Sequence, residues 1–321
     1  MQALVFDGRL RVESNYPNPT LIPGEAIIQT HLAGICNTDF EITRGYKSFQ
    51  GVLGHEFVGT VIACQHTDWL GKRVVGDINA ACFTCARCQR GDYSHCLNRT
   101  TLGIMQRDGA MAEYFSLPIA CLHEVPDSMP DHMAVFAEPL AAALEILDQT
   151  HVRPTDRIAL VGDGKLGILC AQVLRLPGSQ VTLFGRHPER WEWLEHMGIQ
   201  TLHSSDMGAQ HVIASFDIAV DCTGHPAGLS FARSLVRPRG RLVIKSTFAA
   251  DSQLDLTSIV VDEIQLIGSR CGPFDAGLRI LEQGLIQVEP LIAARFPLSE
   301  GLEAMTFAEH RLKVLLEITD G

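Results

Sequence analysis

Residues 34–59 read GICNTDFEITRGYKSFQGVLGHEFVG, a stretch in which glycines flank a cysteine and a histidine. Cys36 and His55 are nineteen residues apart, and each is followed closely by a carboxylate, Asp39 or Glu56. Thiolate, imidazole and carboxylate are the ligands that Zn²⁺ prefers in proteins. Taken alone, the pair is more typical of one buried cysteine and one core histidine. A metal site here therefore requires a third ligand elsewhere in the chain.

Four further cysteines crowd into one short stretch, at Cys82, Cys85, Cys88 and Cys96. Four thiolates with the spacing CxxCxxCx7C can close a tetrahedral shell around one Zn²⁺ and leave no ligand position open. The alternative, four free thiols on a polar loop, would be prone to oxidation. We therefore predict a structural zinc that pins this loop and does not touch substrate.

The length and composition are those of a globular protein with two domains. The chain has 321 residues, of which 46% are hydrophobic and 20% charged, and a formal net charge of −11. This acidic balance, without long like-charge runs, argues against nucleic acid or an anionic membrane as the main partner. No apolar run reaches the ~18 residues of a membrane span, and the first residues do not read as a signal peptide. We expect a cytoplasmic protein with a small-molecule substrate.

The character of the chain changes near residue 131. Before it, short runs separated by Pro and Gly turns predict a compact β-rich domain, with strands near 1–6, 26–32, 57–64, 72–76 and 112–117. After it, a helical stretch over 131–149 leads into alternating helices and apolar strands, the strands being 157–161, 180–184, 216–222, 241–246 and 264–267. This alternation predicts a parallel sheet covered on both faces. We expect the tail after residue 290 to return to the first domain.

A glycine-rich loop follows the first of these later strands and opens a helix. In this context a GxGxxG motif binds the pyrophosphate of a dinucleotide at the helix N-terminus. The glycines permit the tight turn, the approach of the ligand to the backbone, and close packing of helix on strand. The alternative is that they serve packing alone. We predict cofactor contacts from Gly162, Asp163, Gly164, Lys165, Leu166 and Gly167.

The end of the next strand bears on the choice between the two nicotinamide dinucleotides. An acidic residue about twenty positions after the glycine loop would hold the ribose 2′-hydroxyl of NAD. This chain has Gly185, Arg186 and His187 there, and no carboxylate. The glycine leaves room and the arginine can pair with a 2′-phosphate, so NADP(H) is favoured over NAD(H). If Arg186 is instead a solvated charge that starts a helix, NAD remains possible.

Four motifs occur in the order GICNTD, GHEFVG, the four-cysteine spacing and VGDGKLG. With them the whole chain resembles the zinc-dependent medium-chain dehydrogenase/reductase (alcohol dehydrogenase-like) family, and most closely its polyol, sorbitol and threonine dehydrogenase-like branch. The resemblance implies an α/β protein whose GroES-like β-rich catalytic domain spans 1–126 and carries the zinc loop 82–96. It implies a Rossmann NAD(P)-binding domain with a doubly wound parallel sheet over 127–288, and a return to the catalytic domain over 289–321.

The same resemblance implies a second, catalytic zinc, held by Cys36, His55 and Glu138 with water in the fourth position. Glu138 precedes Pro-Leu, as the third ligand does in that branch. The alternative for Glu138 is a carboxylate that is favoured by the dipole at a helix N-terminus. Glu56 would be an alternate or transient ligand of the metal. Asp39 would be the carboxylate that orients the ligand histidine.

Two further residues are implied in proton transfer and three in cofactor binding. Thr38 occupies the hydroxyl position that bonds the substrate oxygen and passes its proton on. Many relatives continue this relay with a histidine; here Glu41 stands in its place, and either Glu41 or water takes the proton. Thr223, Lys245 and Arg270 lie in segments that line the nicotinamide half of the cofactor in the family.

The resemblance thus implies a zinc-dependent oxidoreductase with two zinc ions per chain that acts as a homodimer or homotetramer. It would transfer a hydride between a secondary, polyol or sugar alcohol and NAD(P)⁺, and the product would be a ketone or aldehyde. Two other classes of function remain. A zinc-independent enone or quinone reductase of the same superfamily generally lacks the Cys36 and His55 pattern and the four-cysteine loop. A non-catalytic, zinc-stabilised protein would keep the fold and bind no dinucleotide.

Overall fold

The computed structural model describes residues 1–205, 212–247 and 254–319. The chain divides into two compact units, one formed by Met1–Glu138 with Phe274–Gly321 and the other by Pro139–Pro273. The first unit is therefore discontinuous in sequence, as the expected return of the tail requires. The boundaries differ from the expected ones, because residues 127–138 and 274–288 belong to the first unit.

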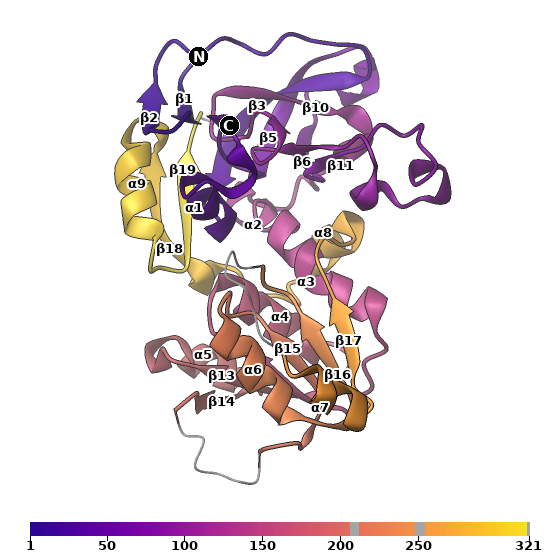
Figure 1. The fold of residues 1–321 in the computed structure, drawn as a ribbon. Coiled ribbons are helices and arrows are strands. Elements are labelled where there is room, and N and C mark those ends of the chain that lie inside the picture. The colour runs from indigo at the N-terminus through magenta and orange to yellow at the C-terminus, as the bar shows by residue number, and fades with distance from the viewer. Residues whose placement is uncertain (206–211, 248–253, 320–321) are drawn as a thin grey trace. The chain divides into compact units, whose positions relative to one another are not determined.

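The first unit is built on an antiparallel sheet with strand order β11-β6-β5-β3-β19-β18, in which β10 also pairs with β3 and only β18 and β19 are parallel (Figure 1). Two smaller sheets, β2-β1-β4 and β7-β8-β9, complete it. The strands are β1 Ala3–Phe6, β2 Leu10–Glu13, β3 Glu25–Gly34, β4 Gly51–Val52, β5 Glu56–Cys64, β6 Arg73–Gly76, β7 Asn79–Ala80, β8 Thr100–Leu102, β9 Gln106–Arg107, β10 Tyr114–Pro118, β11 Leu122–Glu124, β18 Ile292–Pro297 and β19 Lys313–Glu317. The pairing of β19 with β3 joins the C-terminal strand to the sheet, as predicted for the tail.

Short helices flank this sheet: α1 Asn37–Thr43, α2 Asp131–Ala134, α8 Phe274–Glu282 and α9 Gly301–Ala308. Helix α2 belongs to this unit because Asp131 is held there by two basic side chains. His31 Nδ1 and Arg73 Nη1 each lie 2.7 Å from one of its carboxylate oxygens. Helix α8 begins at Phe274, whose ring stacks on that of His123 with centroids 5.0 Å apart. These contacts explain why both boundaries lie inside the range expected for the second domain.

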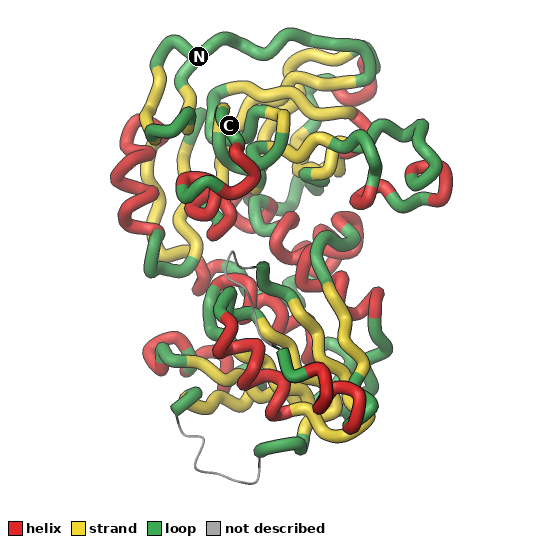
Figure 2. Tube along the Cα trace, viewed as in Figure 1, coloured by secondary structure: helices red, strands yellow, loops and turns green. Residues whose placement is uncertain are grey.

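The second unit contains one parallel sheet with strand order β14-β13-β12-β15-β16-β17. Figure 2 shows its yellow strands alternating with red helices. The strands are β12 Arg157–Val161, β13 Gln180–Gly185, β14 Gln200–His203, β15 Phe216–Asp221, β16 Val236–Ile244 and β17 Gln265–Gly268. The helices are α3 Ala137–Gln149, α4 Lys165–Arg175, α5 Glu192–His196, α6 Pro226–Leu235 and α7 Leu256–Val261. Helix α3 begins in the first unit. The order is that of a Rossmann fold, with the reversal of strand order between β12 and β15.

The structure confirms the predicted strands of this sheet within a few residues, and adds β14, which the sequence analysis did not predict. β14 carries little apolar signal, since its four residues are Gln, Thr, Leu and His. The expected helical stretch 131–149 is broken into α2 and α3. Within the described residues, no helix is both long and apolar enough to cross a membrane.

Candidate metal centre and dinucleotide loop

Asp39 holds together the two segments that carry Cys36 and His55. Its position in the third residue of α1 lets Oδ2 accept a hydrogen bond from the backbone N of Cys36 at 2.8 Å. Oδ1 accepts from the backbone N of Gly54 at 3.3 Å and lies 3.6 Å from Nδ1 of His55. Asp39 is fully buried, so these partners compensate a carboxylate that water does not reach. This agrees with its expected role as the carboxylate beside the ligand histidine.

Glycines make room for the second ligand segment. Gly54 has φ of +99°, a left-handed conformation that glycine adopts without strain, and it turns the chain into β5 at His55 and Glu56. Gly34 lies across the sheet from Glu56, and a Cβ there would lie only 2.4 Å from a carboxylate oxygen of Glu56. The carboxylate of Glu56 therefore occupies a space that only a glycine at residue 34 leaves open.

Cys36 Sγ, a ring nitrogen of His55 and a carboxylate oxygen of Glu56 all lie within 4.8 Å of one another. We refer to these three residues as the metal centre. Burial opposes a charge on His55, but the anionic groups of Asp39 and Cys36 outweigh it and raise the pKa of His55 well above its usual value. An environment that stabilises an imidazolium also stabilises a metal cation bound to the neutral ring. The donor set and its charge therefore fit Zn²⁺.

Glu138, the expected third ligand, lies close to the metal centre but outside this set of donors within the described residues. Burial raises the pKa of Glu138 to about 7, with the His55 and Glu56 charges acting on it in opposite directions. It stands in the first turn of α3. Among the described residues, Glu56 is thus the carboxylate grouped with Cys36 and His55, and the assignment of Glu138 as the third ligand stays a prediction.

Lys313 completes this site, and the sequence analysis did not find it. It begins β19, only 2% of it is exposed, and its ammonium pairs with Glu56 and donates to the carbonyl of Ile35 at 3.3 Å. Burial favours the neutral amine, but the charges of Glu56 and Cys36 outweigh burial and raise the pKa of Lys313. The sequence signal was slight: a lysine that opens the apolar strand KVLLE.

Thr38 and Glu41 lie one turn apart on α1 but face different partners. The hydroxyl of Thr38 lies 3.8 Å from Sγ of Cys36, beside the metal centre. The carboxylate of Glu41 accepts a hydrogen bond from Arg44 at 3.0 Å, in a surface pocket that Glu309 also lines. Thr38 is therefore placed to act at the metal centre, whereas Glu41 is paired with a surface arginine.

The four cysteines of residues 82–96 converge as predicted. Sulfur–sulfur distances are 3.5 Å between Cys96 and Cys82, 3.6 Å between Cys85 and Cys88, and 3.8 Å between Cys85 and Cys96. Zn–S bonds of about 2.3 Å in a tetrahedron would place the sulfurs about 3.8 Å apart. Hydrogen bonds from Thr84 lower the pKa of Cys82 to about 5, which favours the thiolate that binds metal. The geometry and chemistry of this loop fit a closed zinc site.

The glycine loop has the geometry expected for a dinucleotide. Gly162 follows β12 with φ of +113°, and a Cβ there would meet the carbonyl oxygen of Cys222 at 2.9 Å. A Cβ on Gly167 would lie 1.9 Å from the carbonyl oxygen of Gly162, so helix and loop pack directly. At Gly164, the residue before α4, no atom lies within 4 Å of an added Cβ. The loop is tight where it packs and open where a pyrophosphate would approach.

The other expected cofactor residues lie at the carboxyl end of the same sheet. Thr223 follows β15 and donates to Asp221 Oδ1 at 2.7 Å. Lys245 follows β16, where burial lowers its pKa, and donates to Ser269 Oγ at 3.1 Å and to the carbonyl oxygen of Arg270 at 2.8 Å. This is the edge at which parallel sheets of this kind bind ligands.

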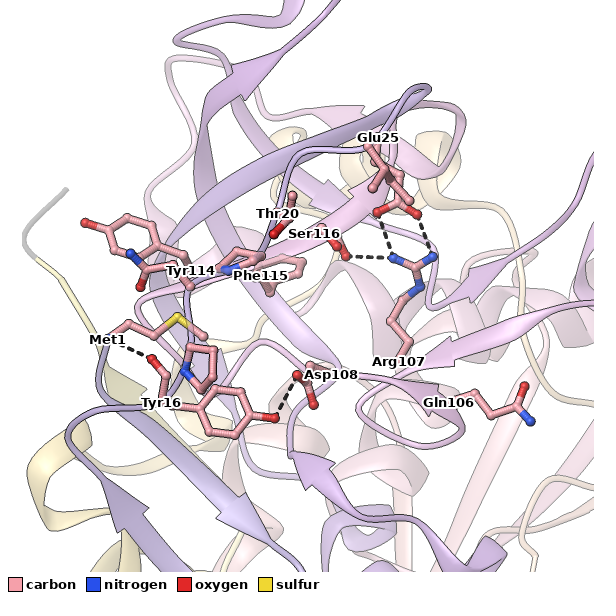
Figure 3. A pocket seen from close by; sticks show the side chains of 14 residues that line it. Met1, Tyr16, Thr20, Glu25, Gln106, Arg107, Asp108, Tyr114, Phe115 and Ser116 are labelled. Carbon is pink, nitrogen blue, oxygen red and sulfur yellow. Dashed lines mark hydrogen bonds and ion pairs between the residues drawn. The ribbon is translucent and has the colours of Figure 1, made fainter.

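A separate cavity of about 380 Å³ lies in the first unit (Figure 3). Its charged groups are already paired with one another: Arg107 donates to both carboxylate oxygens of Glu25 at 3.0 and 2.6 Å, and Tyr16 donates to Asp108 at 2.9 Å. Burial and the charge of Asp108 raise the pKa of Tyr16 to about 12. None of the residues that line this cavity belongs to the metal centre.

Two family models match long stretches of the chain. Residues 22–127 match the family described as alcohol dehydrogenase GroES-like domain, and residues 166–283 match zinc-binding dehydrogenase. Erythritol/L-threitol dehydrogenase of Mycolicibacterium smegmatis is 29% identical, over 98% of this chain and 97% of its own.

Two solved structures are similar over almost the full length. Alcohol dehydrogenase TADH from Thermus sp. ATN1 is 30% identical with a TM-score of 0.89, and the match covers 99% of this chain and 100% of that one. RspB from Escherichia coli CFT073, named a short chain alcohol dehydrogenase and complexed with NADH, is 27% identical with a TM-score of 0.90 and 99% coverage of both chains. The chain therefore belongs to the zinc-binding alcohol dehydrogenase family, as an NAD(P)-dependent dehydrogenase of its polyol branch.

Proposed function

We propose that this protein is a zinc-dependent dehydrogenase that oxidises a secondary alcohol of a polyol or sugar, or reduces the corresponding ketone, with NADP(H). The observation that supports the proposal most is the convergence of Cys36, His55 and Glu56 donors within 4.8 Å of one another. Cys36 caps the N-terminus of α1, His55 immediately precedes β5, and Glu56 is the first residue of β5. Thiolate, imidazole and carboxylate donors are the ligand types that Zn²⁺ takes in proteins.

Cys36, His55 and a carboxylate, either Glu56 or Glu138, would hold the ion. Zinc at such a site supplies Lewis-acid stabilisation of charge on an alcohol oxygen, and the nicotinamide supplies the hydride chemistry. Asp39 fixes the backbone at both ligand segments. Thr38 would take the proton of the substrate hydroxyl, and since Arg44 occupies Glu41, we assign the next proton acceptor to water.

A second zinc would be structural, bound by Cys82, Cys85, Cys88 and Cys96. Their sulfurs are spaced for a tetrahedral ion, and four thiolates leave no position for substrate. The proposal is therefore two zinc ions per chain with different tasks. We further propose a cytoplasmic homodimer or homotetramer.

The cofactor preference rests on the end of β13. The strand ends at Gly185 with no acidic side chain of its own, and the exposed Arg186 follows it. An arginine there suits a 2′-phosphate, whereas NAD sites use a carboxylate to hold the 2′-hydroxyl. RspB was solved with NADH, so family membership by itself does not select the cofactor. The residues at this strand end support NADP(H).

Metal analysis and a substrate panel test the proposal. Purified protein should contain two zinc ions per chain and oxidise erythritol, threitol or related polyols faster than a primary alcohol of equal size. The polyol preference comes from the likeness to the erythritol/L-threitol dehydrogenase. One zinc per chain, lost only when the four-cysteine loop is altered, would contradict the catalytic metal centre. Activity on primary alcohols alone would contradict the substrate class.

A further inference from the structure

A buried carboxylate stands in the middle of the glycine loop. Asp163 lies between Gly162 and Gly164, and only 5% of its side chain is exposed. A buried carboxylate requires hydrogen-bond donors. Among the described residues, the groups that donate to this carboxylate lie in the segment that follows β13. Three of them bond to Oδ2: the backbone N of Arg186 at 3.0 Å, the backbone N of His187 at 2.8 Å and the indole of Trp191 at 3.1 Å.

The fourth partner is the imidazole of His187, whose Nδ1 lies 2.9 Å from Oδ1 of Asp163. An ionised carboxylate only accepts, so Nδ1 carries the hydrogen in this pair, and the four donors match about four acceptor positions. Burial raises the pKa of Asp163, but the hydrogen bonds from His187 and Trp191 outweigh it and hold the pKa below its usual value. Asp163 is thus ionised and already saturated by the protein itself.

This carboxylate occupies the corner above the end of β13. A Cβ added to Gly185 would lie 2.3 Å from Oδ2 of Asp163 and 2.6 Å from its Cβ. Gly185 is 21 residues after Gly164, where the acidic residue of an NAD site would stand to hold the ribose 2′-hydroxyl. Asp163 therefore leaves no space for an acidic side chain at position 185. Because the oxygens of Asp163 already accept hydrogen bonds from the protein, Asp163 does not itself hold the ribose 2′-hydroxyl.

The same contacts direct positive charge to this corner. Asp163 fixes the backbone of Arg186, whose side chain is exposed and makes no ion pair within the described ranges 1–205, 212–247 and 254–319. Arg190 Nη1 donates to the carbonyl oxygen of Asp163 at 3.2 Å, which adds a second guanidinium. Guanidinium groups bind phosphate oxygens in a planar, paired geometry. The corner is thus arranged for an anion.

We infer that Asp163 is a positioning residue that sets cofactor specificity: it blocks the acidic position at Gly185 and fixes Arg186 so that the site takes the 2′-phosphorylated dinucleotide. The inference deepens the proposed function and rests on it. Asp163 makes no contact with the reacting atoms in this role. It acts through Arg186 and the strand end.

Relocating the carboxylate tests the inference. The double variant Asp163→Gly/Gly185→Asp frees the corner and places an acid at the strand end; glycine is needed at 163 because even its Cβ would clash with the new side chain. NADPH and NADH are titrated by fluorescence against the full-length protein. Wild type should bind NADPH more tightly, and the double variant should prefer NADH. In Asp163→Asn, NADPH affinity should fall about tenfold more than NADH affinity, the size of a charge-assisted hydrogen bond.

Two single variants complete the design. Arg186→Ala should lose the same selectivity for NADPH as Asp163→Asn, since both act on one contact, and the double Asp163→Asn/Arg186→Ala should add little further. Glu192→Gln, at an exposed glutamate in the first turn of α5, is the matched charge-removing control and should leave the ratio unchanged. A merely structural role for Asp163 would weaken both dinucleotides equally and lower the unfolding temperature without altering their ratio.

Failure of the inference differs from failure of the proposed function. Wild-type protein that binds neither dinucleotide would overturn the dehydrogenase proposal and with it the inference. Wild type that prefers NADH, or an Asp163→Asn variant that keeps the wild-type ratio of affinities, would overturn the inference alone. If Gly185→Asp by itself folds and prefers NADH with Asp163 in place, Asp163 does not block the corner and the inference is wrong.

Discussion

Two clusters of candidate metal ligands in the first unit are assembled in opposite ways. The four cysteines of residues 82–96 come from one loop, and three short spacings bring them together. The metal centre takes Cys36 from the residue before α1, His55 from the residue before β5, and Glu56 from the start of β5. Glu56 is paired with Lys313 of β19. The loop depends on its own spacing, whereas the metal centre depends on strand pairing across the sheet.

The electrostatic environment also differs between the two clusters. In the loop Cys82 and Cys85 are partly exposed to water, while Cys88 and Cys96 are buried. At the metal centre Asp39, Glu56 and Lys313 are all almost completely buried. Their charges have to be balanced by one another and by the metal. Substitutions in the loop should therefore act locally, while those at the metal centre should affect both turnover and folding.

The largest effect is expected for Cys36→Ser, which removes a proposed ligand of the metal centre. Metal stabilisation of charge in the transition state is worth several kcal/mol, so kcat should fall roughly a thousandfold or more. Dinucleotide affinity should stay near that of wild type, because the glycine loop lies in the other unit. Steady-state kinetics and fluorescence titration measure the two quantities. Cys64→Ser on β5 is the control. Turnover of Cys36→Ser at the wild-type rate would contradict a catalytic role for the metal centre, and the contrast with the four-cysteine loop would not hold.

Lys313→Ala should destabilise the protein by about 3–5 kcal/mol, because it leaves the buried Glu56 without a counter-charge. Denaturant unfolding measures this change. The double variant Lys313→Met/Glu56→Leu should recover most of the loss, since both charges are removed together.

A surface ion pair gives the matched control for Lys313. Lys72 lies 2.6 Å from Glu124 with both side chains substantially exposed, and Lys72→Ala should cost no more than about 1 kcal/mol. Equal effects at the two lysines would show that burial does not distinguish the metal centre from the surface.

Asp39→Asn should weaken zinc binding at the metal centre by about 10–100-fold, the usual cost of altering a carboxylate behind a ligand histidine. The amide still offers an oxygen to Cys36 N or Gly54 N but loses the charge that faces His55. Competition with a chelator measures the affinity. Asp7→Asn, at an exposed ion pair with Arg11, is the control. If zinc affinity is unchanged, Asp39 serves the backbone alone.

The smallest effect on turnover is expected for Cys96→Ser in the four-cysteine loop. One zinc per chain should be lost and the unfolding temperature should fall, but kcat of the folded protein should stay within about twofold, because a closed tetrahedral site has no open position for substrate. Metal analysis, thermal unfolding and kinetics on the same preparation decide this. A large fall in kcat with folding intact would mean that the loop is coupled to the metal centre.

Features whose contacts lie close together in the sequence could be predicted, and features that depend on contacts between distant segments could not. The cysteine spacing and the glycine loop lie within a few residues, so their geometry is encoded locally, and the Rossmann strands other than β14 were found from their apolar runs. Lys313 could not be found, because its place beside Glu56 depends on the pairing of β19 with β3. The space for the Glu56 carboxylate likewise depends on a residue of another strand, Gly34.

Asp163 illustrates a different limit. The motif placed it correctly in the glycine loop, but its partners lie more than twenty residues later, beyond β13. The glycine motif predicts that a residue within it contacts the cofactor, whereas the side chain of Asp163 is directed toward the protein.

The position of Lys313 in the last strand has a consequence for biosynthesis. A ribosome delivers all four cysteines of the loop by residue 96, and they can take up zinc while most of the chain is still unmade. The counter-charge of Glu56 arrives roughly 200 residues later, which at 5–20 residues per second is about 10–40 seconds. During that interval a nascent chain carries Cys36, His55 and Glu56 without their lysine. We therefore expect that the proposed structural ion can bind before the surroundings of the metal centre are complete.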